Sequence, residues 1–272
     1  DMLEPLSRGK MPISLYISQW LLVGICTLAL PQSVVRGISY KNTKALHNAM
    51  IIGTIVIGAM TLVATWIGII SKGVLTEGLA AYGNSVDNIM PLAIIKSLSP
   101  FWAGVIIIGP IAATISTVSS LLLSASSSIV KDVYMNVKGQ RGETLSNDKI
   151  RWYSLAATII LGLIVYFIAI NPPSVIWQIN MFAFGGLETA FFWVLIFGLF
   201  WPKANKCGAI AAMGGGVLVY CLTMAFKIKF MSLHQIVLGI FFSLVLFLIG
   251  NALGSKVDDK TLRIFFPEKF ED

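Results

Sequence analysis

The sequence predicts an all-α integral membrane protein with about seven transmembrane helices. Of its 272 residues, 56% are hydrophobic and only 12% are charged, whereas soluble domains carry about a quarter charged residues. Apolar runs of about 20 residues, the length that crosses a bilayer, recur along the chain. Tryptophans stand near the ends of several runs, where their amphipathic rings favour the membrane interface. The expected spans are residues 12–36, 46–71, 101–127, 150–170, 174–200, 207–226 and 233–253.

The net charge of +7 is explained by orientation in the membrane. When the connectors are assigned to alternating sides, 14 of the 20 Lys and Arg residues fall on one side and 6 on the other. Because basic connectors stay in the cytoplasm, this bias places the N-terminus outside and the C-terminus in the cytoplasm. The basic residues form no stripe, so no nucleic-acid partner is expected. The three cysteines are isolated and lack the paired spacing of a zinc site or a disulfide framework.

The first span contains Pro31 well inside its apolar run. Proline lacks a backbone N–H, and its ring clashes with the carbonyl four residues earlier, here that of Thr27. We therefore expect a broken or kinked helix at residues 27–32. Such a break is tolerated at membrane depth where protein or a cavity satisfies the freed groups. It can form part of a binding site, as half-helices do in transporters, or it can be a kink with no binding role.

Two further segments have a spacing with structural meaning. The connector 72–100 is the longest between spans and includes DNIMPLAIIKSL, which is amphipathic but too short to cross a bilayer. It can cap a vestibule or lie in the interface, and its length does not separate these alternatives. In the span 207–226, Gly208, Ala212 and Gly216 form a small-residue ridge that favours close helix packing.

The third span contains AATISTVSSLLLSASSS, residues 112–128, in which nine of seventeen residues are Ser or Thr. On a helix most of these hydroxyls share one stripe, although Ser119 and Ser126 lie off it. A serine in a membrane helix most often bonds a carbonyl of its own helix or a neighbouring helix. The adjacent pair Ser116 and Thr117, with the carbonyl of Ala113, can instead converge on one hard cation, which prefers oxygen ligands.

The fifth span carries Glu188 almost at its midpoint. An acidic residue at the bilayer centre costs about 3 kcal/mol, and it usually faces the bundle interior and marks a pathway or a buried pair. No Lys or Arg lies in the middle of any span to pair with it. A pathway role, with Asn180 and Gln178 as polar companions, and a structural pairing both stay open.

Several stretches together resemble the sodium:solute symporter family, from about residue 15 to 250. They are LPQSVVRGISYKNTKALHNAMIIGTIV, GPIAATISTVSSLLLSASSSIVKDVY and NPPSVIWQINMFAFGGLETAFFW followed by GLFWPKANKCGA. The segments VRGISYKNTKALH and FAFGGLE are similar to the corresponding segments of family members that transport pantothenate.

The resemblance implies a core of two inverted five-helix repeats of the leucine-transporter type. This chain would supply the second repeat, and the first repeat, the missing N-terminal half, is expected before Asp1. The absence of a signal peptide at Asp1-Met2 agrees with a longer protein. The expected parts are an external segment (1–11), the five-helix second repeat (12–200), two peripheral transmembrane helices (201–254) and a cytoplasmic tail (255–272).

The resemblance also implies where ligands bind. A co-transported sodium ion would be held by the carbonyl of Ala113 and the hydroxyls of Ser116 and Thr117, with further ligands from the first repeat. The substrate cavity would be lined by the broken helix and by the helix of Glu188. The candidate substrate contacts are Thr27, Pro31, Gln32, Asn180 and Glu188.

The expected function is sodium-coupled import of a small organic anion, pantothenate or a related organic acid, by alternating access in the bacterial inner membrane, with no enzymatic reaction. Residues 25–29 read ICTLA and lack the aromatic gate of the family's sugar transporters, which argues against a sugar. The alternatives are another solute such as proline or a monocarboxylate, and a non-transporting sensor or scaffold, for whose signalling domain the short tail leaves no room. A channel is disfavoured because the broken helix suggests an occluded site.

Overall fold

In the part of the chain that the computed structural model describes, every regular element is a helix. The described residues are 11–38, 40–75, 77, 85–140, 146–228 and 230–267. Six helices are long and apolar enough to cross a bilayer, and a shorter apolar stretch precedes them. These seven segments follow the seven apolar runs, which confirms an all-α membrane protein. The shorter stretch is Ile13–Ala29, and the long helices are Thr43–Val74, Pro100–Gln140, Asn147–Ile170, Ile176–Phe200, Lys206–Ala225 and Gln235–Leu253.

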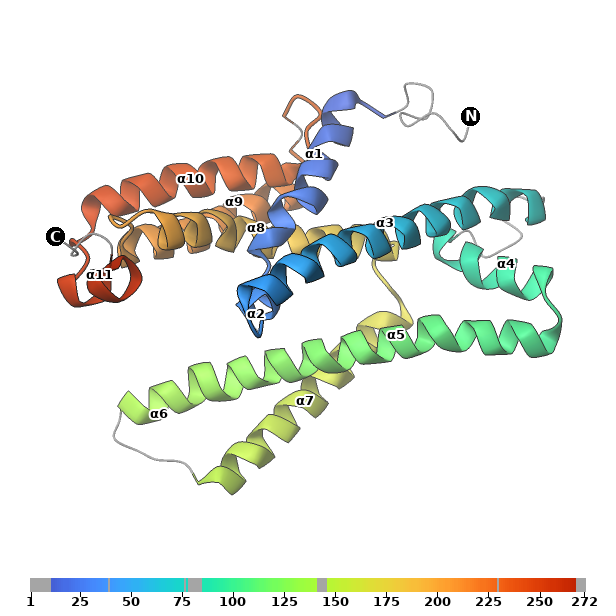
Figure 1. Ribbon diagram of the computed structural model, residues 1–272, viewed down its shortest axis with the longest axis horizontal. Coiled ribbons are helices and arrows are strands. Elements are labelled where there is room, and N and C mark those ends of the chain that lie inside the picture. Colours follow the sequence, from blue (N-terminus) through green and yellow to red (C-terminus); the bar gives the residue numbers. More distant parts are fainter. Residues whose placement is uncertain are drawn as a thin grey trace. The chain divides into compact units, whose positions relative to one another are not determined.

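The helices divide into two compact units (Figure 1). The first unit comprises residues 1–58 and 177–272, the second comprises residues 59–176, and α3 (Thr43–Val74) runs from one into the other. The other elements of the first unit are α1 (Ile13–Gly24), η1 (Cys26–Ala29), α2 (Pro31–Ile38), α8 (Ile176–Phe200), α9 (Lys206–Ala225), α10 (Gln235–Leu253) and α11 (Asp259–Phe265). Those of the second unit are η3 (Val86–Asn88), α4 (Ile89–Ser97), α5 (Pro100–Ser127), the π-helix η4 (Ser128–Met135), α6 (Asn136–Gln140) and α7 (Asn147–Ile170).

Helices α9 and α10 pack side by side and antiparallel along a ridge of small residues (Figure 1). Gly208 lies beside Phe247, and Gly216 lies beside Ser243. A Cβ added at Gly216 would stand 2.7 Å from the Cβ of Ser243, so the close approach requires glycine. The Ser243 hydroxyl donates across the contact to the carbonyl of Ala212 at 3.3 Å. The small-residue ridge expected from the sequence is therefore the contact surface between these helices.

Two aromatic side chains attach α8 to this helix pair. The indole N–H of Trp193 donates to the carbonyl of Ile240 in α10 at 2.9 Å. The hydroxyl of Tyr220 in α9 donates to the carbonyl of Met181 in α8 at 3.2 Å. Such side chains bury a large apolar surface while their one polar atom finds a partner. Together the two bonds determine which face of α8 is turned inward.

A pair of asparagines joins the start of α9 to the end of α10. The backbone N–H of Asn205 donates to Oδ1 of Asn251 at 2.8 Å, and Nδ2 of Asn205 donates to the Asn251 carbonyl at 2.8 Å. Oδ1 of Asn205 also accepts the N–H of Gly208 at 3.0 Å, which caps the first turn of α9. The short connector before α9 is thus fixed by its own side chain.

In the second unit, α5 and α7 pack antiparallel (Figure 1). The hydroxyl of Thr158 in α7 donates to the hydroxyl of Ser126 in α5 at 2.9 Å, and the position of Gly162 faces the side chain of Leu122. Helix α5 continues without a break through η4 and α6, which makes one helical run of 41 residues. This run carries the serine-rich stretch in its middle.

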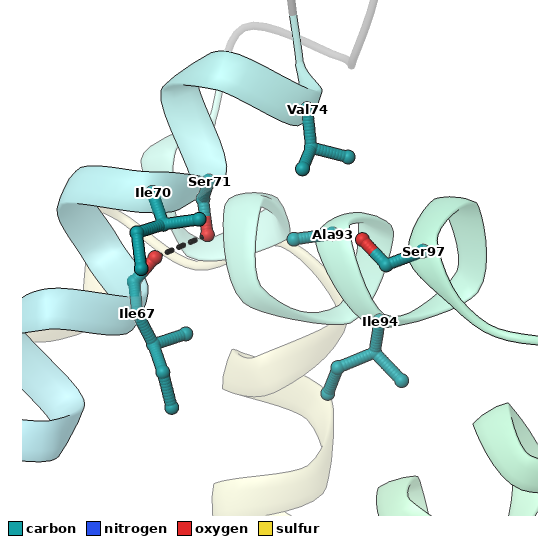
Figure 2. A pocket seen from close by; sticks show the side chains of 7 residues that line it. All are labelled: Ile67, Ile70, Ser71, Val74, Ala93, Ile94 and Ser97. Carbon is teal, nitrogen blue, oxygen red and sulfur yellow. Dashed lines mark hydrogen bonds between the residues drawn. The ribbon is translucent and has the colours of Figure 1, made fainter.

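The amphipathic segment of the long connector forms α4, which has nine residues and is too short to cross a bilayer. A groove of about 200 Å³ lies between α4 and the last turns of α3 (Figure 2). Buried Ser71 of α3 lines this groove, and its hydroxyl donates to the carbonyl of Ile67 at 2.6 Å. Before α4, the carboxylate of Asp87 accepts the N–H of Ile176, the first residue of α8, at 3.1 Å. A vestibule cap and an interfacial helix both fit this arrangement.

We predict that Gly216→Ala destabilises the folded protein by about 1–3 kcal/mol, because overpacking forces neighbours to shift. The added methyl group would meet Ser243 of α10 and Thr189 of α8 at the same time. Gly214→Ala is the matched control, since nothing lies within 4 Å of the added atom. That change should be neutral or stabilising by roughly 0.5–1 kcal/mol, the helix preference of Ala over Gly. Thermal unfolding in detergent measures both, and equal melting temperatures for the two variants would contradict the tight contact.

Candidate functional site

The first apolar segment is broken, as Pro31 predicts. Helix α1 ends at Gly24, the 3₁₀ turn η1 covers Cys26–Ala29, and α2 begins at Pro31. Proline suits the first position of a helix, because its missing N–H would have no partner there in any case. The break expected at residues 27–32 is confirmed. It starts slightly earlier, because the chain before the proline tightens into a 3₁₀ turn.

The break satisfies its freed backbone groups within the protein. The carbonyl of Thr27, which a continuous helix would press against the Pro31 ring, accepts the N–H of Leu30 at 3.2 Å. The Thr27 hydroxyl donates to the carbonyl of Val23 at 2.9 Å. The carbonyl of Leu30 in turn accepts the N–H of Ser33 at 2.8 Å and so starts α2. This internal bonding is the condition for irregular backbone at membrane depth.

The helix before the break is held by a polar contact with the start of α10. The backbone N–H of His234 donates to the hydroxyl of Ser18 at 2.9 Å, and that hydroxyl donates to the carbonyl of Leu15 at 2.8 Å. The imidazole Nδ1 of His234 accepts the N–H of Ile236 at 3.3 Å and caps α10. Burial lowers the pKa of His234, because the cationic imidazolium loses its hydration. A neutral imidazole is also the form that can accept this bond.

One face of α8 is fully buried and carries Glu188. Met181, Gly185, Glu188 and Thr189 follow helical spacing along this face. Glu188 is 0% exposed, and neither of its carboxyl oxygens has a hydrogen-bond partner among the described residues. Cys26, the first residue of η1, packs in one buried cluster with Met181 of this face. The structure therefore brings the buried face of α8 against the broken helix.

The other expected substrate contacts are less enclosed. Thr27, Pro31 and Gln32 are half-buried at the break, and Asn180 is half-buried on α8. A groove of about 270 Å³ lies between the break and the second half of α8. Its described lining contains none of the expected substrate contacts. The lining residues are Ile25, Leu28, Ala29, Val34, Phe192, Leu195, Ile196, Leu199 and Phe200.

The expected sodium ligands lie together near the middle of α5. Ala113, Ser116 and Thr117 are exposed in the described chain. The hydroxyl of Thr117 donates to the carbonyl of Ala113 at 3.0 Å. Two of the three expected oxygens are thus neighbours, at a separation that lets both contact one hard cation. Three oxygens are fewer than the six or so that such cations take, so this helix can form only part of a site.

Several hydroxyls of the serine-rich stretch have ordinary structural partners. Thr114 donates to a carbonyl of its own helix at 2.8 Å, and Ser120 does so at 2.9 Å. Ser126, which lies off the predicted stripe, is fully buried and accepts the bond from Thr158 of α7. Sequence reasoning did not identify this interhelical pair. A threonine in the next span was the available signal, but the sequence does not give the register between two helices.

Sequence reasoning also missed two contacts that hold the site from outside. Tyr220 was not singled out, although it closes over Gly185 on the face of Glu188 and bonds the Met181 carbonyl. The bond between Ser18 and His234 joins residues 216 positions apart. No local pattern marks either contact, because both depend on how distant helices pack.

The comparisons with known proteins agree on one class of protein, the sodium-coupled solute carriers. The model of the sodium:solute symporter family matches residues 1–216. The sodium/pantothenate symporter of Haemophilus influenzae is 36% identical over 262 residues, which are 96% of this chain and 53% of that protein. The sodium/pantothenate symporter of Escherichia coli is 36% identical over 246 residues, 90% of this chain and 49% of that protein. A sodium/proline symporter of Staphylococcus aureus is 25% identical over 242 residues, 83% of this chain and 45% of that protein.

No solved structure matches the chain. The chain spans about half the length of the curated relatives it matches. With a family match over most of its residues, and helices long enough to span a bilayer, it belongs to the sodium:solute symporter family and is a multi-pass membrane protein.

We predict that acid destabilises the protein through His234. The unfolded histidine takes up a proton near its ordinary pKa of about 6.5, whereas the folded one resists protonation to lower pH. The unfolded chain then binds more protons below about pH 6.5, so stability falls as the pH falls through that range. His234→Asn, which keeps a capping side chain, should flatten this dependence. Melting temperatures between pH 5 and 8 test it.

The control for this prediction is the second histidine of the chain. His47 is exposed on α3, outside the contact between α1 and α10, so His47→Asn controls for the loss of an imidazole as such. A His234→Asn variant that loses stability in acid as steeply as the unchanged protein would overturn the assignment to His234.

Proposed function

We propose that the complete protein is a sodium-coupled symporter that imports a small organic anion, pantothenate, by alternating access and catalyses no chemical reaction. One observation carries this proposal: 36% identity to two sodium/pantothenate symporters over at least 90% of the chain. The sodium/proline symporter at 25% identity is more distant, which makes proline the runner-up substrate. The proposed location is the bacterial inner membrane, with the C-terminus in the cytoplasm on the side that carries 14 of the 20 basic residues.

The proposed parts of the chain follow from the family. Residues 12–200 form the five-helix second repeat, residues 201–254 form two peripheral helices, and residues 1–11 and 255–272 lie outside and inside the membrane. The first repeat belongs to the half of the complete protein that precedes this chain. In support, the chain corresponds to about half of each sodium/pantothenate symporter.

The proposed sodium site is built on α5. The Ala113 carbonyl and the hydroxyls of Ser116 and Thr117 supply three oxygens, two of which already stand 3.0 Å apart. The first repeat supplies the remaining ligands. A bound sodium ion then ties α5 to that repeat and favours the outward-open state that accepts the substrate. A ligand can shift a conformational equilibrium only through such a difference in affinity between the two states.

The proposed substrate site lies at the broken helix and α8. Thr27, Pro31 and Gln32 contribute from the break, and Asn180 and Glu188 contribute from α8. Half-helices and unwound backbone commonly form the substrate site of secondary transporters, because their free polar groups point into a cavity. Glu188 is sealed in the conformation seen here, so it meets the substrate only after the break moves relative to α8.

We predict that the double change Ser116→Ala and Thr117→Ala abolishes sodium-driven uptake or weakens the apparent sodium affinity by about 100-fold or more. Each hydroxyl contributes roughly 1.5–3 kcal/mol to a charged ligand, and every 1.4 kcal/mol is a factor of ten. Uptake of labelled substrate against sodium concentration measures the effect. Thr114→Ala is the control, because Thr114 lies on the same helix and bonds only the Pro110 carbonyl in the described chain. Unaltered sodium dependence in the double variant would contradict the proposed sodium site.

We predict that unlabelled pantothenate competes with labelled pantothenate for sodium-driven uptake, whereas proline and short monocarboxylates do not. The expected ranking follows from the identities of 36% and 25% to the two kinds of relative. The measurement uses the complete protein in liposomes with an imposed sodium gradient. Competition by proline alone would move the assignment to the runner-up, and flux that neither saturates nor requires sodium would indicate a channel.

A further inference from the structure

Glu188 occupies an unusual position for a carboxyl group. It stands at the middle of α8, twelve residues from each end, and is 0% exposed. Neither carboxyl oxygen has a hydrogen-bond partner among the described residues, and no other buried side-chain oxygen or nitrogen there lacks one. A polar group without a hydrogen-bond partner inside a membrane helix bundle indicates a ligand, because buried polar groups otherwise form hydrogen bonds.

The groups around Glu188 do not neutralise a negative charge. The buried face of α8 that carries Glu188 packs against Cys26 of η1 and Tyr220 of α9. The Tyr220 hydroxyl donates its proton to the Met181 carbonyl, so it is not available to the carboxyl group. The titratable group at α10 is His234, which caps the first turn of that helix. The buried residues of the described chain include no Lys or Arg.

These surroundings select the ligand. An ionised carboxylate without a partner costs several kcal/mol or more when buried, whereas the neutral acid costs about as much as any unpaired hydroxyl. A sodium ion would need several oxygen ligands. A proton needs only one of the two carboxyl oxygens, which are the only buried side-chain oxygens or nitrogens of the described residues that lack a partner. The site therefore fits a proton.

We propose that Glu188 is a proton-binding site of this protein, sealed and protonated in the conformation seen here. When η1 moves away from α8, water reaches the carboxyl group, the O–H bond breaks, the proton passes to water and a hydrated carboxylate remains. Return of η1 reverses the step, because the site closes only over the neutral acid. Cys26 of η1 packs against the face of α8 that carries Glu188, so movement of the broken helix and protonation are linked. This adds a proton to the proposed sodium symport, although the sealed, protonated state does not depend on that function.

Infrared spectroscopy of the purified complete protein tests the sealed state. The difference spectrum between the unchanged protein and Glu188→Gln should show the carbonyl stretch of one protonated carboxylic acid, lost in the variant. Glu188→Asp should keep a shifted band, which guards against a Gln variant that fails to fold. Glu77→Gln is the control, since Glu77 is 64% exposed and lies 3.8 Å from Lys96. If Glu188→Gln instead loses the band of an ionised carboxylate, in the presence or in the absence of sodium, the proposal is overturned.

A second measurement tests the release step. In liposomes that contain a pH-sensitive dye, addition of sodium and substrate to the unchanged protein should produce a proton signal that disappears in Glu188→Gln and persists in Glu77→Gln. Sodium-driven uptake without any proton signal in the unchanged protein would overturn the release of the proton while leaving the symport intact. If uptake proves not to depend on sodium, the infrared band of the protonated Glu188 should still be present. The proton-binding proposal and the sodium-symport proposal can therefore fail independently.

Discussion

The hydrogen bond from the Leu30 N–H to the Thr27 carbonyl, 3.2 Å long, allows the first apolar segment to break at Pro31. The bilayer core offers no partner for a freed backbone group, so a proline in the first span is tolerated only if the chain satisfies itself. The tight turn before Pro31 does so and divides the span into α1 and α2. The middle of α1 is attached to the start of α10, where the hydroxyl of Ser18 accepts the N–H of His234.

The architecture was largely predictable, because each membrane helix can be recognised from its own stretch of sequence. Length and hydropathy mark the spans, and Pro31 marks the break without knowledge of any neighbour. What could not be predicted is pairing between distant helices, since helical periodicity shows that a side chain shares a face but not what that face meets. Ser126 illustrates the difference: it fell off the predicted stripe and yet is the hydroxyl that α7 covers.

The candidate site was predictable in part for the same reason. Glu188 could be singled out as a carboxyl group at membrane depth, because the chemistry of one residue suffices for that conclusion. Cys26 and Tyr220, which pack on the same face of α8, come from segments far away in the sequence, and neither residue type is unusual in an apolar helix. The sodium ligands Ala113, Ser116 and Thr117 stay a prediction, because their three oxygens are fewer than such a cation takes.

The unbroken helical run from Pro100 to Gln140 has a mechanical consequence. At 1.5 Å per residue its 41 residues extend about 60 Å, roughly twice the 30 Å hydrocarbon core of a bilayer. Part of the run therefore extends beyond the hydrocarbon core, and its C-terminal part, η4 and α6, carries the basic residues Lys131 and Lys138. Because the run is continuous, a tilt at one end moves the other end over a distance set by this length. A change at membrane depth can thus be transmitted along one helix to the surface of the bilayer.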